Sequence, residues 1–226
     1  MYRHSPNYEP AQLPPTVRTC AVCQRRLELG HIACPNPLCA SSGRWFRWNV
    51  AAAERGGALE VALDAYKYAG ETVWAAPFGR MLAALLTATR LLDGCDLVIA
   101  SPTFVGSGGR EFDHTRAILT SLAVHLSPEH GRRCDLDPTP AIIKTGPTPA
   151  LAGRSHAERR WIAQERIRPV LRVPDPGRTS GRRILVVDDV FTDGRTLDEV
   201  ARALRLQGGA RQVCGVSLCR QPWRGS

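Results

Sequence analysis

Four cysteines near the N-terminus have the residue type and the spacing of a metal site. They form two close pairs, Cys20 with Cys23 and Cys34 with Cys39. Two such pairs separated by about ten residues match the reach of two knuckles that fold around one tetrahedral zinc ion. His31 could replace one cysteine, but the regular pairing argues against it. We find no signal-peptide pattern in residues 1–18, so we expect reduced thiols and a closed, structural zinc site.

A second set of candidate residues lies in one continuous run, Ile184 to Thr196. Its four leading aliphatic residues predict a buried strand, and a turn and a helix follow. Ligands of open α/β sheets bind beyond the carboxyl ends of the strands, where a helix start offers unpaired N–H groups to a phosphate. The turn and helix start would hold that phosphate through Thr192, Asp193, Gly194, Arg195 and Thr196.

Two adjacent acids, Asp188 and Asp189, stand between this strand and this turn. Neighbouring carboxylates can accept hydrogen bonds from the two hydroxyls of a ribose. Together with the phosphate cradle they predict a ribose-5-phosphate site, and we expect both acids to serve the ligand and not the core. A receiver domain also begins with an acidic pair, but too few residues follow Asp189 for that fold. A plain turn with solvated acids is the other alternative.

The hydrophobic pattern alternates between strands and helices. Strands are predicted at 96–100, 141–143, 183–187 and 213–218, and helices at 74–89, 113–126, 155–167 and 196–206. This alternation predicts an α/β fold, a parallel sheet flanked by helices. We expect three parts: a flexible arm at 1–18, a small zinc ribbon-like module at 19–48, and the α/β domain at 49–226.

The net charge of +9 comes from 28 arginines and only two lysines, Lys67 and Lys144. A basic excess favours anionic ligands, and nucleic acid is one candidate partner. The run Arg44-Trp45-Phe46-Arg47-Trp48 could stack on bases, although such clusters more often pack a small module against its neighbour. The sequence has no membrane-spanning stretch, so we expect a cytoplasmic protein without a membrane partner.

The Ile184–Thr196 run resembles the phosphoribosyl-pyrophosphate signature of type I phosphoribosyltransferases. The wider chain is similar to the ComF family in the order of its blocks: the four cysteines, the Tyr66-Lys67-Tyr68 segment, the Ser101-Pro102 loop and then the signature. The resemblance implies a parallel-sheet core, a mobile flap and magnesium that enters with the pyrophosphate. It also implies that Asp188 and Asp189 bind the ribose, that residues 192–196 bind the 5-phosphate, and that Ser101 and Pro102 approach the pyrophosphate.

Two features depart from this family pattern. Asp193 stands where the family usually has threonine or a small residue, and we expect its carboxylate to turn outward and pair with Arg195. The flap segment 145–149 lacks the arginine and glutamine typical of ComF relatives. Three arginines further along it could instead close over pyrophosphate: Arg154, Arg159 and Arg160.

Our hypothesis is a magnesium-dependent transfer of ribose 5-phosphate to an unidentified nitrogen nucleophile, with Asp188 and Asp189 as the catalytic pair. The alternative is a non-catalytic protein that senses the same ligand or has a nucleic-acid-associated, competence-type role. A third reading keeps the fold only as an interaction scaffold. The acceptor, and whether the chain forms a homo-oligomer, stay open at this point.

Overall fold

The computed structural model describes residues 18–27, 33–126, 134–136, 139–151 and 153–222. The predicted N-terminal arm, apart from Arg18, and His31 lie outside these ranges. The helices are α1 (Pro37–Ala40), α2 (Gly57–Tyr68), α3 (Ala75–Thr89), α4 (His114–His125), α6 (His156–Ile162) and α7 (Arg195–Leu206). The strands are β1 (Asn49–Glu54), β2 (Leu97–Ala100), β3 (Asp135–Leu136), β4 (Ile143–Lys144), β5 (Leu171–Arg172), β6 (Arg183–Phe191) and β7 (Gln212–Arg220).

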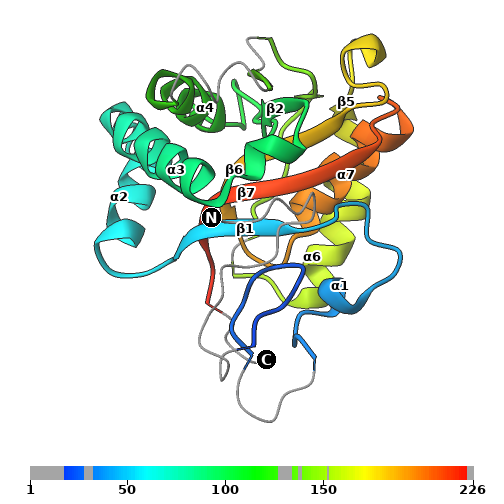
Figure 1. Cartoon of the computed structure of the whole chain (residues 1–226), viewed down its shortest axis with the longest axis horizontal. Helices are drawn as coiled ribbons and strands as arrows, with labels where there is room; N and C mark the ends of the chain where they lie inside the picture. Colours follow the sequence, from blue (N-terminus) through cyan, green and yellow to red (C-terminus); the bar gives the residue numbers. More distant parts are fainter. Residues whose placement is uncertain (1–17, 28–32, 127–133, 137–138, 152, 223–226) are drawn as a thin grey trace.

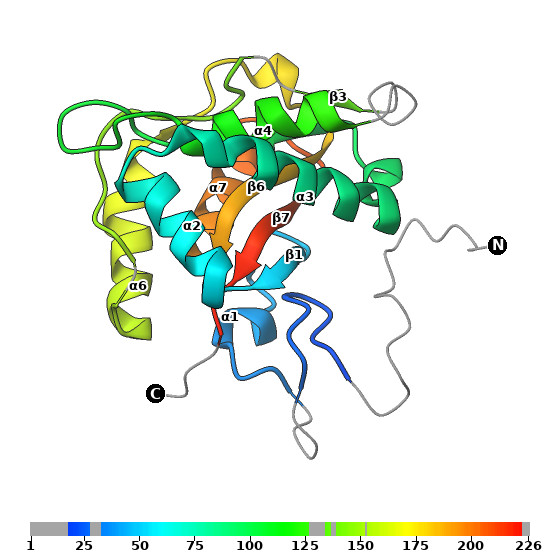
Figure 2. The same cartoon turned by 90° about the vertical axis from the view of Figure 1, so that its left-hand side faces the viewer.

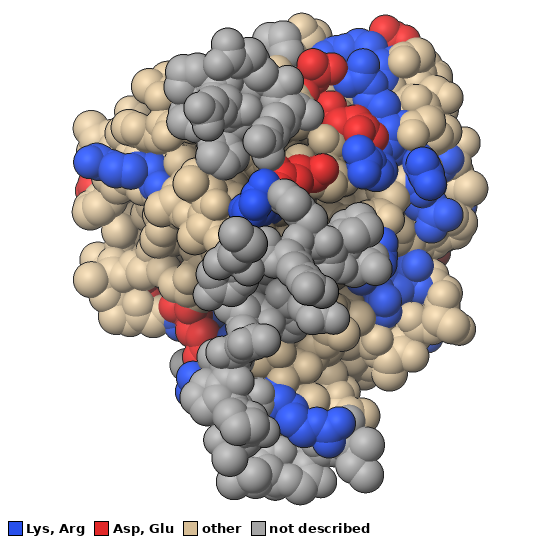
Figure 3. All heavy atoms as spheres, in the orientation of Figure 1, with Lys and Arg blue, Asp and Glu red and all other residues tan. Residues whose placement is uncertain are grey.

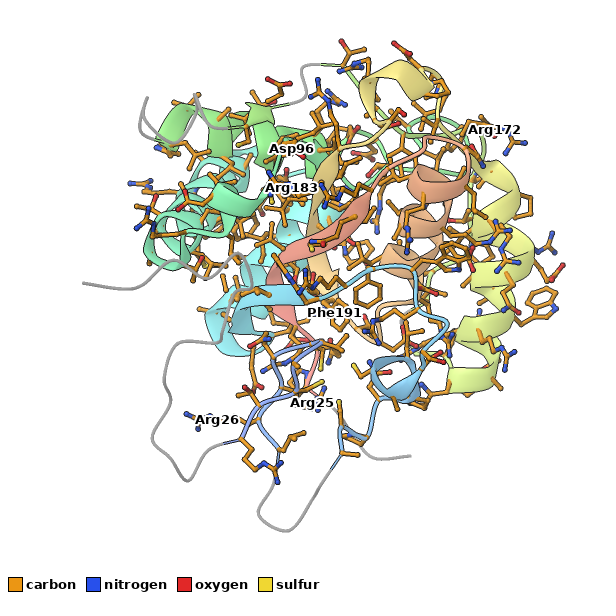
Figure 4. All side chains as sticks on the ribbon, turned by 45° about the vertical axis from the view of Figure 1, so that its right-hand side comes forward. Arg25, Arg26, Asp96, Arg172, Arg183 and Phe191 are labelled. Carbon is orange, nitrogen blue, oxygen red and sulfur yellow. The ribbon has the colours of Figure 1, made fainter. Side chains whose placement is uncertain are left out.

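Five strands form one parallel sheet in the order β1-β7-β6-β2-β3, and helices cover both of its faces (Figure 1). The expected α/β class is therefore confirmed. β6 lies at the centre, where Val187 is in register with Ala100 of β2 and with Val216 of β7. Parallel strands covered on both faces need continuous apolar runs, which explains the unbroken aliphatic sequence of β6. Asp96 and Arg183 pair at 2.7 Å where β2 and β6 begin (Figure 4).

Alternate residues of β6 face the two layers of the molecule, as the pleat of a strand requires. Leu185 and Val187 belong to the core under α2, α3 and α4. Ile184 and Val186 belong to the core under α7 and α6 (Figure 2). The α3 and α4 helices approach closely because Gly79 has no side chain: a Cβ there would lie 2.4 Å from the Ser121 hydroxyl.

Several predicted elements have different bounds in the structure. The strand predicted at 183–187 continues to Phe191, because β7 pairs with it as far as Arg220 and the acids do not interrupt the backbone ladder. The strand predicted at 141–143 lies instead at Ile143 and Lys144, which pair with β5 in a separate two-stranded antiparallel sheet. The 155–167 helix ends as an α-helix at Ile162 and continues as a π-helical turn to Ile167. The prediction did not include α1, β1, α2, β3 or β5.

The N-terminal module, residues 19–48, packs against the end of the sheet from which the site is built. The N–H of Asn49 donates to the carbonyl of Val22 at 2.7 Å, and the Arg220 guanidinium donates to the carbonyl of Cys23 at 3.1 Å. Figure 4 shows Phe191 at the boundary between sheet and module, with Arg25 and Arg26 on the module side. Whether the module folds independently, as the predicted domain division implies, stays a prediction. In the part of the chain that the structure describes, no helix is long and apolar enough to cross a membrane.

Candidate functional site

A pocket of about 400 Å³ lies at the carboxyl end of β6 and β2. The residues that the sequence analysis assigned to the ribose, the 5-phosphate and the loop after β2 all line it: Ser101, Pro102, Asp188, Asp189, Thr192, Asp193, Gly194, Arg195 and Thr196. Ser101 is held by the sheet, because its N–H donates to the carbonyl of Val187 at 2.8 Å. The structure thus brings the loop after β2 and the turn after β6 to one cavity.

The turn after β6 ends at Gly194, which has a φ of 88° and precedes the first residue of α7. This left-handed conformation favours glycine. A Cβ at Gly194 would also lie 2.9 Å from the Phe191 ring and 3.1 Å from the Phe46 ring. The first turn of a helix has N–H groups without intrahelical partners, and here that turn opens into the pocket. The arrangement is a potential anion site.

Asp189 is the centre of a buried charge network. Its Oδ2 atom lies 2.6 Å from the Lys67 Nζ of α2 and 2.8 Å from the His114 Nε2 of α4. Burial alone would raise the pKa of this carboxyl, but the Lys67 charge and the His114 hydrogen bond outweigh burial and hold the pKa well below its usual range. The Asp189 carboxylate therefore ties α2 and α4 to the central strand.

Asp188 has a different environment. Its Oδ1 accepts the N–H of Asp189 at 3.0 Å, and it follows the alternation of Ile184 and Val186, toward the α7 layer. Burial, with the negative charge of Asp189 as the second cause, raises the pKa of Asp188 to about 6. Of the two acids, Asp188 is the one whose ionised form is disfavoured by its surroundings, so it is the one that a hydrogen-bond donor or a cation would stabilise.

The structure corrects the expected geometry of Asp193. Its carboxylate is buried, with 2% of the residue exposed, and it does not turn outward to the Arg195 guanidinium. Oδ1 accepts the backbone N–H of Arg195 at 3.2 Å, while Oδ2 lies 3.7 Å from His156 and 3.8 Å from Arg159 of α6. A short side chain at the start of a helix reaches the backbone donor more readily than a distant guanidinium. Asp193 consequently faces α6, the helix that follows the flap segment.

The two lysines of the chain, Lys67 and Lys144, both line the pocket. Lys144 donates to the Thr148 hydroxyl at 3.2 Å. Burial lowers the pKa of Lys144, although the nearby Asp188 charge opposes this shift. Arg55, Arg110 and Arg195 add three further cations to the lining. The sequence analysis did not assign Lys144 or His114 to the site, and Lys67 entered it only through the family resemblance.

The flap segment lines the pocket, but not through the three expected arginines. Its lining residues are Lys144, Pro147, Thr148, Pro149, Ala150 and Leu151. Arg154 pairs with Glu158 at 3.7 Å on the exposed side of α6, and Arg159 donates to the Leu151 carbonyl at 3.1 Å. Arg154, Arg159 and Arg160 are all absent from the described lining. In this arrangement Arg159 holds the flap in place and faces Asp193.

The four N-terminal cysteines form a compact cluster. Cys20, Cys23, Cys34 and Cys39 have Sγ atoms within 4.8 Å of one another, and Cys20 and Cys23 are buried. A hydrogen bond from the Cys23 side chain pushes the pKa of Cys20 down, while the Cys20 side chain pushes that of Cys39 up. Four thiolates this close repel one another unless a cation lies between them. The cluster could hold a metal ion such as zinc, as the spacing predicts.

The aromatic and basic run that follows the cluster serves packing. Phe46 is buried and meets the ring of Phe191 edge to face at 6.1 Å, and Arg44 donates to the carbonyls of Phe46 and Cys39. Trp45 lies under the guanidinium of Arg205 at 5.6 Å. On the face in Figure 3, Lys and Arg side chains gather mainly on the side of β5 and α7. The residues considered as a nucleic-acid contact, Arg44 to Trp48, do not line the pocket.

Comparison with known proteins does not narrow the class further. No protein-family model and no curated protein matches the chain.

Proposed function

We propose that the chain is a type I phosphoribosyltransferase-like protein, similar to the ComF family, that binds phosphoribosyl pyrophosphate in the pocket at the end of β6. The observation that carries the proposal is the convergence of Asp188, the Ser101-Pro102 loop and the 192–196 turn on one cavity. The parallel sheet supports it too, because ligands of such sheets bind at this edge.

Each part of the ligand has matching chemistry in the pocket. The 5-phosphate fits the turn at Gly194, where helix N–H groups and the hydroxyls of Thr192 and Thr196 are the donors. The ribose diol fits Asp188, whose strained carboxylate gains from accepting hydroxyl hydrogen bonds. The pyrophosphate fits the side with Lys144 and Arg110. Magnesium would enter with the pyrophosphate and supply charge neutralisation, and the Asp188 carboxylate is an oxygen ligand of the type it prefers.

The proposed reaction is substitution at the anomeric carbon of the ribose. The C1–O bond to pyrophosphate breaks with its electron pair leaving on oxygen, a C1–N bond forms to the acceptor, and the proton lost by the acceptor nitrogen passes to the departing pyrophosphate. Positive charge develops on the sugar as the bond breaks. As the acid proposed to accept the ribose hydroxyls, Asp188 would both orient the sugar and stabilise this charge.

Ligand binding without transfer is a second candidate, and the Asp189 network favours it. Its Oδ2 atom already contacts Lys67 and His114, and this leaves Asp188 alone to meet the ribose. Sensing requires binding and a change in the flap, not a stabilised transition state. Pyrophosphate release distinguishes the two candidates.

Calorimetry with magnesium and phosphoribosyl pyrophosphate tests the binding, and pyrophosphate release against a panel of bases and amines tests the transfer. We expect binding by the wild type and at least tenfold weaker binding by Thr196→Val, which removes a hydroxyl donor at the phosphate turn. Thr89→Val is the matched control, because its hydroxyl bonds only to the Leu85 carbonyl on α3 and lies outside the pocket lining.

Absence of binding in the wild type, at millimolar ligand and with magnesium present, would overturn the proposal. Equal affinities of Thr196→Val and Thr89→Val would remove the phosphate from the 192–196 turn. Binding with no pyrophosphate release across the panel would favour the sensing candidate.

A further inference from the structure

Asn36 joins the cysteine cluster to the phosphate turn. It lies between Cys34 and Cys39 in the sequence and is 2% exposed. Its Oδ1 accepts the N–H of Leu38 at 3.0 Å and so caps α1, while its Nδ2 donates to the backbone carbonyl of Asp193 at 2.9 Å. Both ends of one buried amide are therefore used, one inside the cysteine module and one on the turn that lines the pocket.

Two further contacts reach the same turn from the same module. Phe46 packs edge to face on Phe191 and leaves no room for a side chain at Gly194. The N–H of Trp45 donates to the Asp198 carboxylate, in the first turn of α7, at 2.7 Å. The module therefore contacts both the turn and the start of α7, and none of its described residues lines the pocket.

We infer that the cysteine module is a support for the phosphate-binding turn, and that Asn36 is the positioning residue through which metal occupancy of Cys20, Cys23, Cys34 and Cys39 controls ligand affinity. The identity of the ligand rests on the proposed function, whereas the mechanical link does not. The module acts on the ligand indirectly, through the backbone and the packing of the turn, because Asn36 itself does not line the pocket.

The physical reason is the small size of the module. A module of thirty residues, with one short helix in its described part, buries too little apolar surface to hold its shape alone, so a metal ion supplies that free energy. When the cluster loses its ion, the 34–39 segment that carries Asn36 is released. The Asp193 carbonyl then loses its buried donor, and the turn gains freedom that a ligand must remove again on binding.

The test uses the full chain and measures three quantities: metal content, hydrogen exchange of the 190–198 backbone, and the dissociation constant for magnesium–phosphoribosyl pyrophosphate. Asn36→Asp keeps the oxygen that caps α1 but places an oxygen against the Asp193 carbonyl. Asn36→Ser is a second variant, which can still cap α1 but is too short to reach the Asp193 carbonyl. Ser41→Ala is the control, since its side chain is exposed and bonds only to the N–H of Gly43 within the module.

We expect both Asn36 variants to retain zinc, to exchange faster in 190–198 but not in β2 or α4, and to bind the ligand about tenfold more weakly. In the wild type, zinc removal by dialysis should likewise speed the exchange of 190–198 and weaken ligand binding. Zinc reloading should reverse both effects. Zinc removal from Asn36→Asp should add much less than it does to the wild type, because both changes break one link.

Unchanged exchange of 190–198 after zinc removal would overturn the inference, whatever the ligand does. Fully additive effects of zinc removal and Asn36→Asp would overturn the role of Asn36. If the wild type binds no phosphoribosyl pyrophosphate, the proposed function fails, and the exchange measurements still decide whether the module supports the turn. If both variants lose zinc, the exchange response of the wild type to zinc removal and reloading decides.

Discussion

Asp188 and Asp189 are neighbours in the sequence but belong to opposite layers of the molecule. In a strand, successive side chains point to opposite faces, so Asp189 follows Val187 toward α2 and α4 and Asp188 follows Val186 toward α7. Asp189 meets Lys67 and His114 there and forms a network that holds the fold together. Asp188 has no part in this ion-pair network and lines the pocket. One acid therefore has a structural role and the other is the proposed ligand-binding acid.

The same substitution at each acid should have opposite effects. Asp189→Asn removes the charge that compensates the buried Lys67, so we expect a loss of about 3–5 kcal/mol in the free energy of unfolding. Asp188→Asn should leave the fold intact and weaken binding of magnesium–phosphoribosyl pyrophosphate at least tenfold. Urea denaturation and calorimetry on the two variants check this, and each variant is the control for the other. Similar stabilities for the two would contradict the division of roles.

The raised pKa of Asp188 makes a prediction that needs no ligand. Its pKa is about 6 in the folded chain and about 3.9 when unfolded, so its stability contribution is complete below pH 4 and is lost as the pH rises through 6. Asp188→Asn should therefore become more stable than the wild type between pH 5 and 7.5, by about 1–2 kcal/mol. Melting temperatures of both proteins across that range measure it. A difference that does not vary with pH would show that Asp188 titrates normally.

The sequence predicted the lining residues of the loop after β2 and of the β6–α7 turn, but not Lys144 or His114, and not what each acid contacts. The signature run is local, so its strand, turn and helix could be predicted from neighbouring residues. The partners of Asp189 are 122 and 75 positions away, and pairing over such distances depends on how α2 and α4 pack. Strand alternation, applied to the acids as well as to the aliphatic residues, was the signal available in the sequence.

At the level of elements, the turn between β6 and α7 depends on one glycine. Gly194→Ala would force a left-handed φ on an alanine and press its Cβ against Phe191 and Phe46. We expect a loss of about 2–4 kcal/mol in stability and a large loss of ligand affinity. Gly94→Ala is the control, because a Cβ there meets nothing within 4 Å and its φ is not left-handed. Equal melting temperatures for the two variants would show that the turn tolerates a side chain.

Element prediction succeeded where burial and periodicity agree and failed where pairing decides. The β2, α3, α4, α7 and β7 elements were predicted to within two residues because their apolar residues repeat at helix or strand spacing. β1 begins at Asn49 and continues through three alanines, which signal no strand, and it exists because β7 offers an unpaired edge. β3 and β5 have two residues each and depend entirely on their partner strands.

On the scale of the whole molecule, the lysines and arginines differ in where they lie as well as in number. Arginines outnumber lysines fourteen to one in the sequence, yet both lysines lie in the pocket. A lysine is a compact, mobile cation whose pKa shifts on burial, whereas arginine stays charged everywhere. Arginines here join elements through carbonyls and carboxylates, as Arg220 does with Cys23 and Glu54. The pocket therefore holds both lysines beside three of the arginines, Arg55, Arg110 and Arg195.

The N-terminal module completes the molecule, and its metal content is the last prediction. Cys23→Ser should reduce bound zinc from one equivalent to well below one, because oxygen is a poorer ligand than thiolate in such a site. Cys95→Ser is the matched control: Cys95 is also a buried thiol, but it belongs to the core under α3 and α4, whereas Cys23 belongs to the core on the other face of the sheet. Both variants lose some stability, so the readout is elemental analysis of protein purified without chelator.

We expect one equivalent of zinc in the wild type and in Cys95→Ser. Residues 19–48 should become sensitive to protease in Cys23→Ser while the sheet stays protected. Wild-type protein without zinc, or full zinc in Cys23→Ser, would show that the four thiols pack together without serving as a metal site.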